Sequence, residues 1–184
     1  MKKLAMLATL LVVAITNSNA QESTPTELVS NHSINTNFTG VDYSFEHKIG
    51  GKFAMNYSAA LGSNIIISDG DFYYSLIPYI IAEPRYYYNL NKRALKGKST
   101  YKNSASYIAL KSRLLFSPIY ANNEDMENNT EFQIAPVWGI KRVYGDHFLM
   151  DVHIGLGIAA GRNEFFGAIV MPKLFSGIKL GYIF

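Results

Sequence analysis

Apolar and polar residues alternate with a period of two along much of this 184-residue chain. The pattern is clearest from His147 to Gly157, where the polar face carries Asp151 and His153 together with glycines. Successive side chains of a β-strand point to opposite sides, so this period predicts a strand with one apolar face. That face consists of Phe148, Met150, Val152, Ile154, Leu156 and Ile158.

Six further segments repeat the alternation, which makes seven predicted strands. Single-chain bacterial barrels have an even number of strands. We therefore expect the weaker pattern from Leu28 to Phe38 to form the first of eight, followed by a tight turn at Thr39 and Gly40. The six segments are residues 41–46, 52–61, 72–88, 107–116, 131–141 and about 170–184.

Several of these segments contain a proline. Proline cannot donate a hydrogen bond to a neighbouring strand, and inside sheets it is mostly found at edges and bulges. We therefore expect bulges or strand ends at these positions. The residues are Pro78, Pro84, Pro136 and Pro172.

The last strand ends the chain on an aromatic residue. Its apolar positions, at every second residue, include Ile178, Leu180, Tyr182 and Phe184. In transmembrane barrels the outward face meets lipid and is flanked by belts of aromatic residues. We expect Tyr182 and Phe184 to lie in the belt on the periplasmic side.

The first twenty residues have the features of a secretory signal peptide. Lys2 and Lys3 precede an apolar run from Leu4 to Ile15, and Ala20 ends a small-residue cleavage site. The run is shorter than the roughly 20 residues that a membrane-spanning anchor helix needs. We therefore expect cleavage after Ala20, with residues 21–184 forming a single domain in the cell outer membrane.

Composition narrows the fold and the partners further. Removing Lys2 and Lys3 from the 17 basic residues leaves 15 against 14 acidic ones, and no basic stripe suggests nucleic-acid binding. There is no cysteine, which excludes disulfides and thiolate metal sites. A membrane chain without spanning helices must close a barrel, because lipid offers no partner to unpaired backbone groups. The alternative is a soluble, lipocalin-like barrel with its apolar face turned inward.

Eight strands with both termini in the periplasm fix the side on which each connection lies. Residues 47–51, 89–103 and 143–146 become periplasmic turns, and residues 39–40, 63–71, 117–129 and 161–169 become outer loops. Turn 89–103 holds a run of basic residues, which we interpret as a solvated surface, with a specific binding site as the alternative. The acidic loop is interpreted as a hydrated tip, with divalent-cation binding as the alternative. The basic residues are Lys92, Arg93, Lys96 and Lys98, and the acidic ones Glu124, Asp125 and Glu127.

Charged residues on the predicted inward faces almost balance. An eight-stranded interior is just wide enough to be filled by side chains. Leaving a buried charge unpaired costs several kcal/mol. The sequence therefore predicts an ion-paired, plugged interior, which argues against a general porin and leaves a narrow ion path open. The acids are Asp42, Glu46, Glu83, Glu131 and Asp151, and the bases are Arg85, Lys111, Arg113, Lys141, Lys173 and Lys179.

Asp151 and His153 are the best candidates for general acid–base catalysis, because they share one face of one strand. We interpret the pair as a hydrogen-bonding element of the interior. Neither Ser106 nor Ser112 has a base beside it in the sequence. The pair Asp69 and Asp71 is interpreted as a glycine turn. We expect no cofactor and no metal site.

The chain resembles the small outer-membrane β-barrel proteins of Gram-negative bacteria, especially those of the Bacteroidota. The resemblance rests on the signal peptide, on EPRYYYNLNKRALKGKST, on VWGIKRVYGDHFLMDVHIGLGIA and on the terminal GYIF. It implies an eight-stranded barrel, here expected to be monomeric, in contact with membrane lipid and lipopolysaccharide. It also implies insertion by the barrel assembly machinery, which would read Tyr182 and Phe184. Barrel deacylases of lipid A carry a His-x-Ser-Asn pattern, whereas the matching place here reads His153-Ile154-Gly155-Leu156.

Three functional hypotheses follow from the sequence. The first is a non-enzymatic barrel with a structural or surface-interaction role, favoured by the balanced interior and the lack of a nucleophile. The second is a lipid-modifying or proteolytic barrel enzyme that uses Asp151 and His153 or acidic residues at the outer rim. The third is a small, narrow channel.

Overall fold

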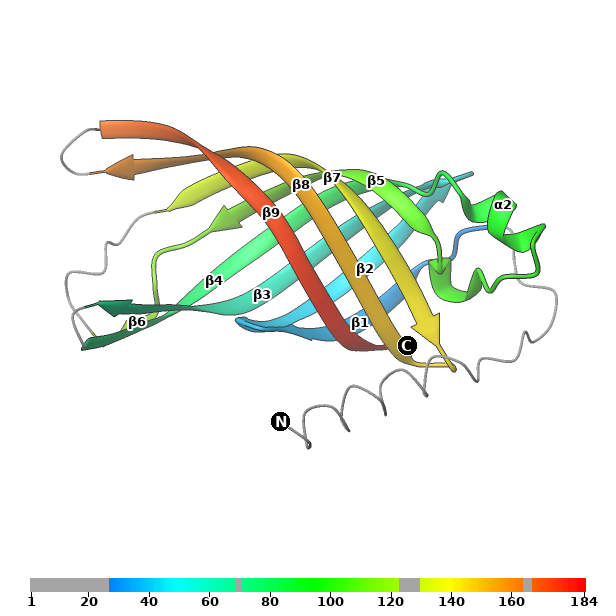
Figure 1. Ribbon diagram of the computed structural model, residues 1–184, viewed down its shortest axis with the longest axis horizontal. Coiled ribbons are helices and arrows are strands. Elements are labelled where there is room, and N and C mark those ends of the chain that lie inside the picture. The colour runs from blue at the N-terminus through cyan, green and yellow to red at the C-terminus, as the bar shows by residue number, and fades with distance from the viewer. Residues whose placement is uncertain (1–26, 69–70, 123–129, 164–166) are drawn as a thin grey trace.

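The computed structural model describes residues 27–68, 71–122, 130–163 and 167–184. Within these ranges, nine antiparallel strands form one sheet whose pairings run in a ring (Figure 1). One short helix, α2 (Leu90–Ala94), and one 3-10 helix, η1 (Tyr101–Asn103), lie between two of the strands. The expected all-β, antiparallel architecture is confirmed.

Eight of the strands follow one another around the ring in chain order, and each pairs with the next. The last strand, β9, pairs with the first, β1. The ninth strand, β6, was not predicted, because two residues are too few to show an alternation; it pairs with β4. The strands are β1 (Asn31–Asn37), β2 (Gly40–Gly50), β3 (Phe53–Ser68), β4 (Asp71–Tyr86), β5 (Ser106–Leu115), β6 (Tyr120–Ala121), β7 (Glu131–Tyr144), β8 (Phe148–Asn163) and β9 (Gly167–Ile183).

Strand β1 lies inside the segment with the weakest sequence pattern, Leu28 to Phe38. Its alternation is nevertheless clear in the structure, since Ser33 and Asn35 are buried while Ile34 and Thr36 are exposed. All seven of its residues pair with β2, but only residues 33–36 pair with β9. The prediction of a strand here is confirmed.

The two faces of the sheet have opposite character. In β2, Asp42, Ser44 and Glu46 are buried, whereas Val41 and Tyr43 are exposed. The same arrangement holds along the other long strands, so the interior of the ring is polar and the outer surface is apolar. Apolar side chains that are at least two-fifths exposed on this outer surface include Ile108, Leu110, Trp138, Ile154, Leu156, Leu174 and Ile178.

The hairpins extend further than their sequence patterns indicated. Strand β3 continues to Ser68 and β4 starts at Asp71, so the predicted loop 63–71 is mostly strand. In the same way, β8 reaches Asn163 and β9 starts at Gly167, inside the predicted loop 161–169. Three consecutive isoleucines, residues 65–67, hid the alternation near the end of β3, and Gly161, Arg162 and Asn163 hid it at the end of β8. The turn after β1 is Phe38 and Thr39, while Gly40 already belongs to β2, where a Cβ would collide with the Leu61 backbone.

All four prolines lie within strands, and three of them, contrary to expectation, mark neither a bulge nor a strand end, because the register is the same on either side of Pro84, Pro136 and Pro172. Pro78 differs, since it lies where the partner of β4 changes from β5 to β6 and the register shifts by two residues. The pairing of β4 with β5 skips residues 83–84, and that of β7 with β8 skips residues 135–136, before each resumes. At Pro84 and Pro136, the missing backbone donor therefore leaves a short gap in the strand pairing, which continues in the same register beyond it. Another register shift lies between Lys48 and Gly50, in the pairing of β2 with β3.

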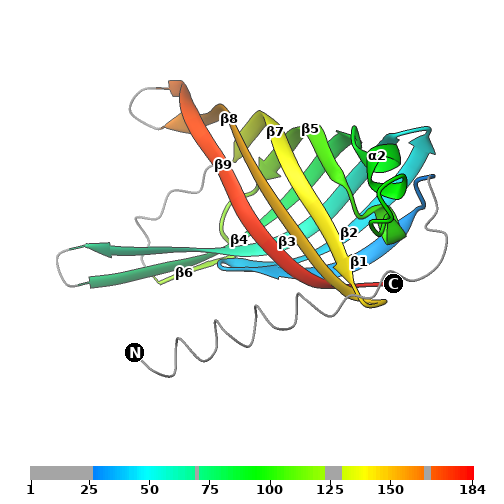
Figure 2. The ribbon, with the colours of Figure 1, turned by 45° about the vertical axis from the view of Figure 1, so that its right-hand side comes forward.

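The connection between β4 and β5 covers one end of the ring, as Figure 2 shows by the position of α2. Its Leu90 is fully buried and belongs to one apolar cluster with Leu28 and Tyr87. The Asn103 side chain accepts a hydrogen bond from the Val29 amide at 2.9 Å and donates one to the Val29 carbonyl at 2.8 Å. The basic side chains of Lys92, Lys96 and Lys98 are exposed, as expected of a solvated surface, whereas Leu90 and Asn103 of the same connection are buried and close this end of the ring.

We expect Gly139→Ala to destabilise the sheet. Gly139 lies directly opposite Tyr107, and a Cβ at this position would collide with the Tyr107 ring. Overpacking of this kind costs about 1–3 kcal/mol. The measurement is urea unfolding in detergent, followed by the fluorescence of Trp138, the sole tryptophan.

The matched control is Gly161→Ala, where the nearest atom would lie 3.8 Å from the new Cβ. Its unfolding midpoint should stay at or slightly above that of the wild type, because alanine also loses less backbone entropy than glycine. Equal midpoints for the two variants would show that Tyr107 does not occupy this space.

Candidate functional site

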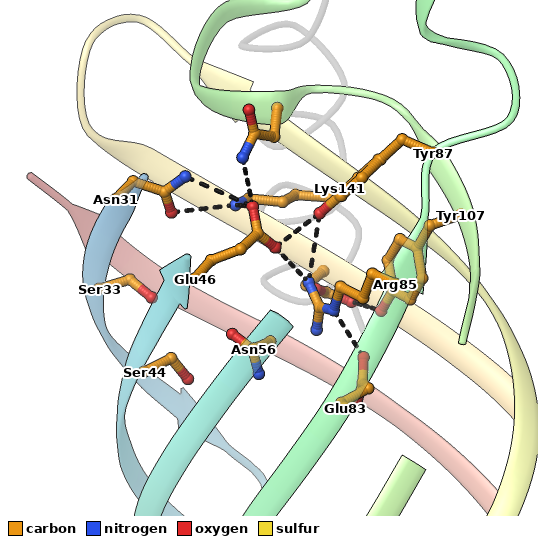
Figure 3. A network of polar contacts seen from close by, with 12 residues as sticks. Asn31, Ser33, Ser44, Glu46, Asn56, Glu83, Arg85, Tyr87, Tyr107 and Lys141 are labelled. Carbon is orange, nitrogen blue, oxygen red and sulfur yellow. Dashed lines mark hydrogen bonds and ion pairs between the residues drawn. The ribbon is translucent and has the colours of Figure 1, made fainter. Parts of the chain in front are cut away.

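Glu46 is the centre of a buried network of charges at the covered end of the ring (Figure 3). Its Oε2 accepts hydrogen bonds from Arg85 Nη1 at 3.1 Å and from the Tyr87 hydroxyl at 2.7 Å. Its Oε1 accepts one from Lys141 Nζ at 3.0 Å and is also bound by the side-chain amides of Asn31 and Asn103. Strand β2 brings Glu46 to this point because inward side chains recur at every second residue.

Arg85 connects Glu46 to two further carboxylates. Its Nε donates to Glu83 at 2.6 Å and its Nη1 donates to Asp151 at 3.1 Å. The guanidinium carbon lies 4.3 Å from the centre of the Tyr107 ring, whose hydroxyl donates to Asp151 at 2.7 Å. One arginine thus links β2, β4, β5 and β8 across the interior.

A second layer of ion pairs lies further along the interior. Lys111 Nζ is 3.4 Å from Glu83 Oε2, and Lys179 Nζ is 3.0 Å from Asp42 Oδ2. The other oxygen of Asp42 accepts hydrogen bonds from Ser44 at 2.6 Å and Asn35 at 3.0 Å. These charges are almost fully buried, so their partners offset a large desolvation cost.

Beyond the second layer lies one more exposed ion pair, which joins Lys173 to Glu131 at 2.8 Å. Glu131 also accepts a hydrogen bond from the side-chain amide of Gln133. Of the eleven inward charges proposed from the sequence, ten therefore take part in ion pairs. The exception is Arg113, which has no ion pair with any residue that the structure describes.

Asp151 and His153 share the inner face of β8, but they are not hydrogen-bonded to each other. Asp151 is held by Arg85 and Tyr107, and His153 Nε2 lies 2.9 Å from Lys111 Nζ. Neither residue is hydrogen-bonded to a serine or threonine hydroxyl in the described part of the chain. The arrangement supports a hydrogen-bonding role in the interior and provides no relay to a nucleophile.

The sequence analysis missed the neutral members of the network. Tyr87 and Tyr107 both lie at inward positions of their strands or just beyond them, so the alternation could have identified them. Asn31 lies at an inward position of the weakest strand pattern. Asn103 belongs to a turn in which no sequence period applies, and only the folded connection brings it to Glu46.

The two residues expected to form an assembly signal lie at the end of β9, on its outer face. The Tyr182 ring stacks on His147 with the ring centres 4.5 Å apart, and the Phe184 ring lies 5.4 Å from Tyr182. The Phe184 amide donates to the carbonyl of His32 at 2.9 Å. The last residue therefore contributes both a ring to the outer surface and a backbone bond beside the end of β1.

Some sequence-based predictions lie outside the described residues. They are the signal peptide with its cleavage site at Ala20, the candidate acid Asp69 and the acidic loop with Glu124, Asp125 and Glu127. In the described ranges, no helix has the length and apolarity to cross a membrane. The same ranges contain no group of three or more metal-ligating side chains.

Comparison of the chain with protein-family models, with curated proteins and with solved structures gives no match.

We expect Glu46→Gln to unfold the protein at clearly lower urea than the wild type. The substitution keeps the size of the side chain but leaves Lys141 without its carboxylate. Removing one partner of a buried pair costs about 3–5 kcal/mol. Urea unfolding followed by Trp138 fluorescence measures the change.

Glu27→Gln is the matched control. Glu27 also pairs with a lysine, Lys48, at 2.7 Å, but its side chain is 79% exposed. Exposed pairs contribute little to stability, so the control should unfold like the wild type. If the two variants unfold alike, the Glu46 network does not stabilise the fold.

Proposed function

We propose that this chain is an integral outer-membrane β-barrel protein of a Gram-negative bacterium, with a structural or surface-interaction role and no enzymatic activity. One observation carries the proposal: an exposed apolar surface surrounds a ring whose interior encloses almost all of its inward charges in ion pairs. Soluble proteins bury their apolar side chains and expose their charges. The reverse arrangement fits a chain that has lipid as its surroundings.

Aromatic side chains at the strand ends near α2 support the same proposal. Phe53 and Tyr86 lie opposite each other at the ends of β3 and β4, with ring centres 4.8 Å apart. Trp138 Nε1 donates to the Tyr88 hydroxyl at 2.8 Å on the outer surface. Tyrosine and tryptophan with one apolar and one polar side are typical of the membrane–water interface. Together with Tyr182 and Phe184 they form the proposed periplasmic belt.

The soluble lipocalin-like alternative is disfavoured by the direction of the side chains. A lipocalin-like barrel binds its ligand in an apolar interior. Here the inner face at the covered end carries Glu46, Glu83, Arg85 and Lys141. A soluble protein with this interior would leave its apolar outer face in water.

A channel is also disfavoured. The ion pairs around Arg85 span the interior, and the α2 connection covers the ring at the same end. An open path for ions would require both the ion pairs around Arg85 and the α2 connection to move. The proposed eight-stranded barrel is therefore plugged at its periplasmic end.

The proposal is tested by cell fractionation and gel migration. We expect the mature chain in the outer-membrane fraction. It should also migrate differently in boiled and unboiled samples on a detergent gel, because backbone pairing around the whole ring resists detergent until it is heated. Identical migration together with a soluble periplasmic location would contradict the proposal.

We expect deletion of Phe184 to reduce membrane assembly strongly. The deletion removes the terminal ring of the proposed assembly signal and the backbone bond to His32. The measurement is the heat-modifiable fraction in outer membranes after a short induction. Phe184→Tyr, which keeps the ring and the backbone bond, should assemble as the wild type does. Normal assembly of the deletion variant would rule out this role of the terminus.

A further inference from the structure

The half of the ring away from α2 contains a cavity of about 950 Å³. This volume lies within the range of roughly 300–1,000 Å³ that is typical of small-molecule sites. Its polar lining includes His153, Lys179 and Gln133, which belong to the ion-paired interior or adjoin it. Its apolar lining includes Ile77, Tyr79, Ile81, Leu115, Ile169 and Met171.

Two residues of this lining each carry a polar atom without a hydrogen-bond partner. The two atoms are Arg113 Nε and Gln133 Oε1, both buried. Arg113 and Gln133 are directly opposite each other in the pairing of β5 with β7. Such residues have Cβ atoms about 4.5–5.5 Å apart. A cationic donor and a neutral acceptor therefore come from neighbouring positions at the wall of the cavity, where both atoms have almost no accessible surface, and leaving each unsatisfied is costly.

No other buried polar atom without a hydrogen bond, among those of the described residues, belongs to a residue that lines the cavity. The remaining buried atoms without a hydrogen bond belong to Asn35, Asp42 and Glu83, none of which lines the cavity. The lysines of the lining, Lys173 and Lys179, already pair with Glu131 and Asp42. Among the described residues that line the cavity, Arg113 is the basic side chain without an ion pair, although its charge also acts on Glu131, and its guanidinium lies over the rings of Tyr79 and Phe175.

The cavity also reaches the outer surface beside β9. Only residues 180–183 of this strand pair with β1, so the rest of its edge on that side has no strand partner in the described chain. Ser176 and Ile178 point outward by the alternation of β9, yet both line the cavity, as do Phe38 and Thr39 of the turn after β1. In Figures 1 and 2 the β3–β4 and β8–β9 hairpins diverge at this end.

We propose that this cavity binds a single-chain amphiphile whose anionic group lies next to a hydroxyl. The anionic group binds Arg113, the hydroxyl donates to Gln133 Oε1, and the chain leaves along the apolar wall through the opening between β9 and the turn at Phe38 and Thr39. The inference rests on the proposed function, because lipid at the outer surface provides both the ligand and its route.

The test measures binding to the purified full-length mature protein in neutral detergent by native mass spectrometry. The probe is 3-hydroxytetradecanoate, which carries a carboxylate, a neighbouring hydroxyl and one chain. We expect a one-to-one complex, with at least tenfold weaker binding for tetradecanoate, which lacks the hydroxyl, and for 1,3-tetradecanediol, which lacks the charge. Inorganic phosphate should not compete at the same concentration. Equal binding of all three chain compounds, or none, would overturn the proposal.

Variants connect the binding to the two residues. Arg113→Gln and Gln133→Leu should each weaken binding of 3-hydroxytetradecanoate at least tenfold, because each removes one of the two polar contacts. Lys98→Gln, an exposed base in the connection at the other end, is the matched control and should bind as the wild type does. Unchanged binding by both cavity variants would contradict the proposed site.

A photoreactive probe tests the opening without any substitution. A 3-hydroxytetradecanoate with a diazirine at its far end should label residues 37–39 or 169–179 of the wild-type protein. Labelling confined to other parts of the outer surface would show that the chain does not leave by this route. A protein that shows heat-modifiable migration but no binding would refute this inference alone, whereas soluble behaviour would refute the proposed function first.

Discussion

The short pairing between the first and last strands is the contact on which the ring depends. Residues 33–36 of β1 pair with residues 180–183 of β9, and the Phe184 amide adds a bond to His32. The other neighbouring strands share longer pairings. Because β1 is short, this contact is confined to the end covered by α2. It therefore explains why the edge of β9 has no strand partner further along in the described chain, and it is the reason for the predicted effect of deleting Phe184.

The interior of the ring also differs between the end covered by α2 and the opposite end. Near the β1–β9 contact, Arg85 gathers carboxylates from three strands and the α2 connection closes the ring over them. Toward the other end the ion pairs become fewer and more exposed, and the cavity begins. The proposed barrel would thus be rigid and plugged on its periplasmic side and able to admit a ligand on its outer side. A fully ion-paired interior would leave no room for a ligand.

Much of the fold could be predicted from the sequence, because a period of two states both the presence of a strand and the direction of its side chains. Glu46 and Lys141 were placed on inward faces by parity alone. The alternation does not show which charged side chains form pairs. Arg85 and Asp151 are 66 residues apart, and their contact depends on the register of several strands. The contribution of Asn103 depends on a left-handed backbone at φ 66°, which no pattern indicates. The cavity was missed because the alternation gives the direction of each side chain and not the space that the inward side chains leave between them.

The central claim is that the apolar outer surface lies in lipid while the charged face is enclosed. The chain has no cysteine, so single-cysteine variants can carry one spin label each. The most direct measurement compares the accessibility of labels at Leu156→Cys and Ile154→Cys, on the outer face, to oxygen and to a water-soluble nickel complex in reconstituted bilayers. The account predicts high oxygen accessibility and almost no nickel accessibility at both positions. Free access of the nickel complex to both would contradict it.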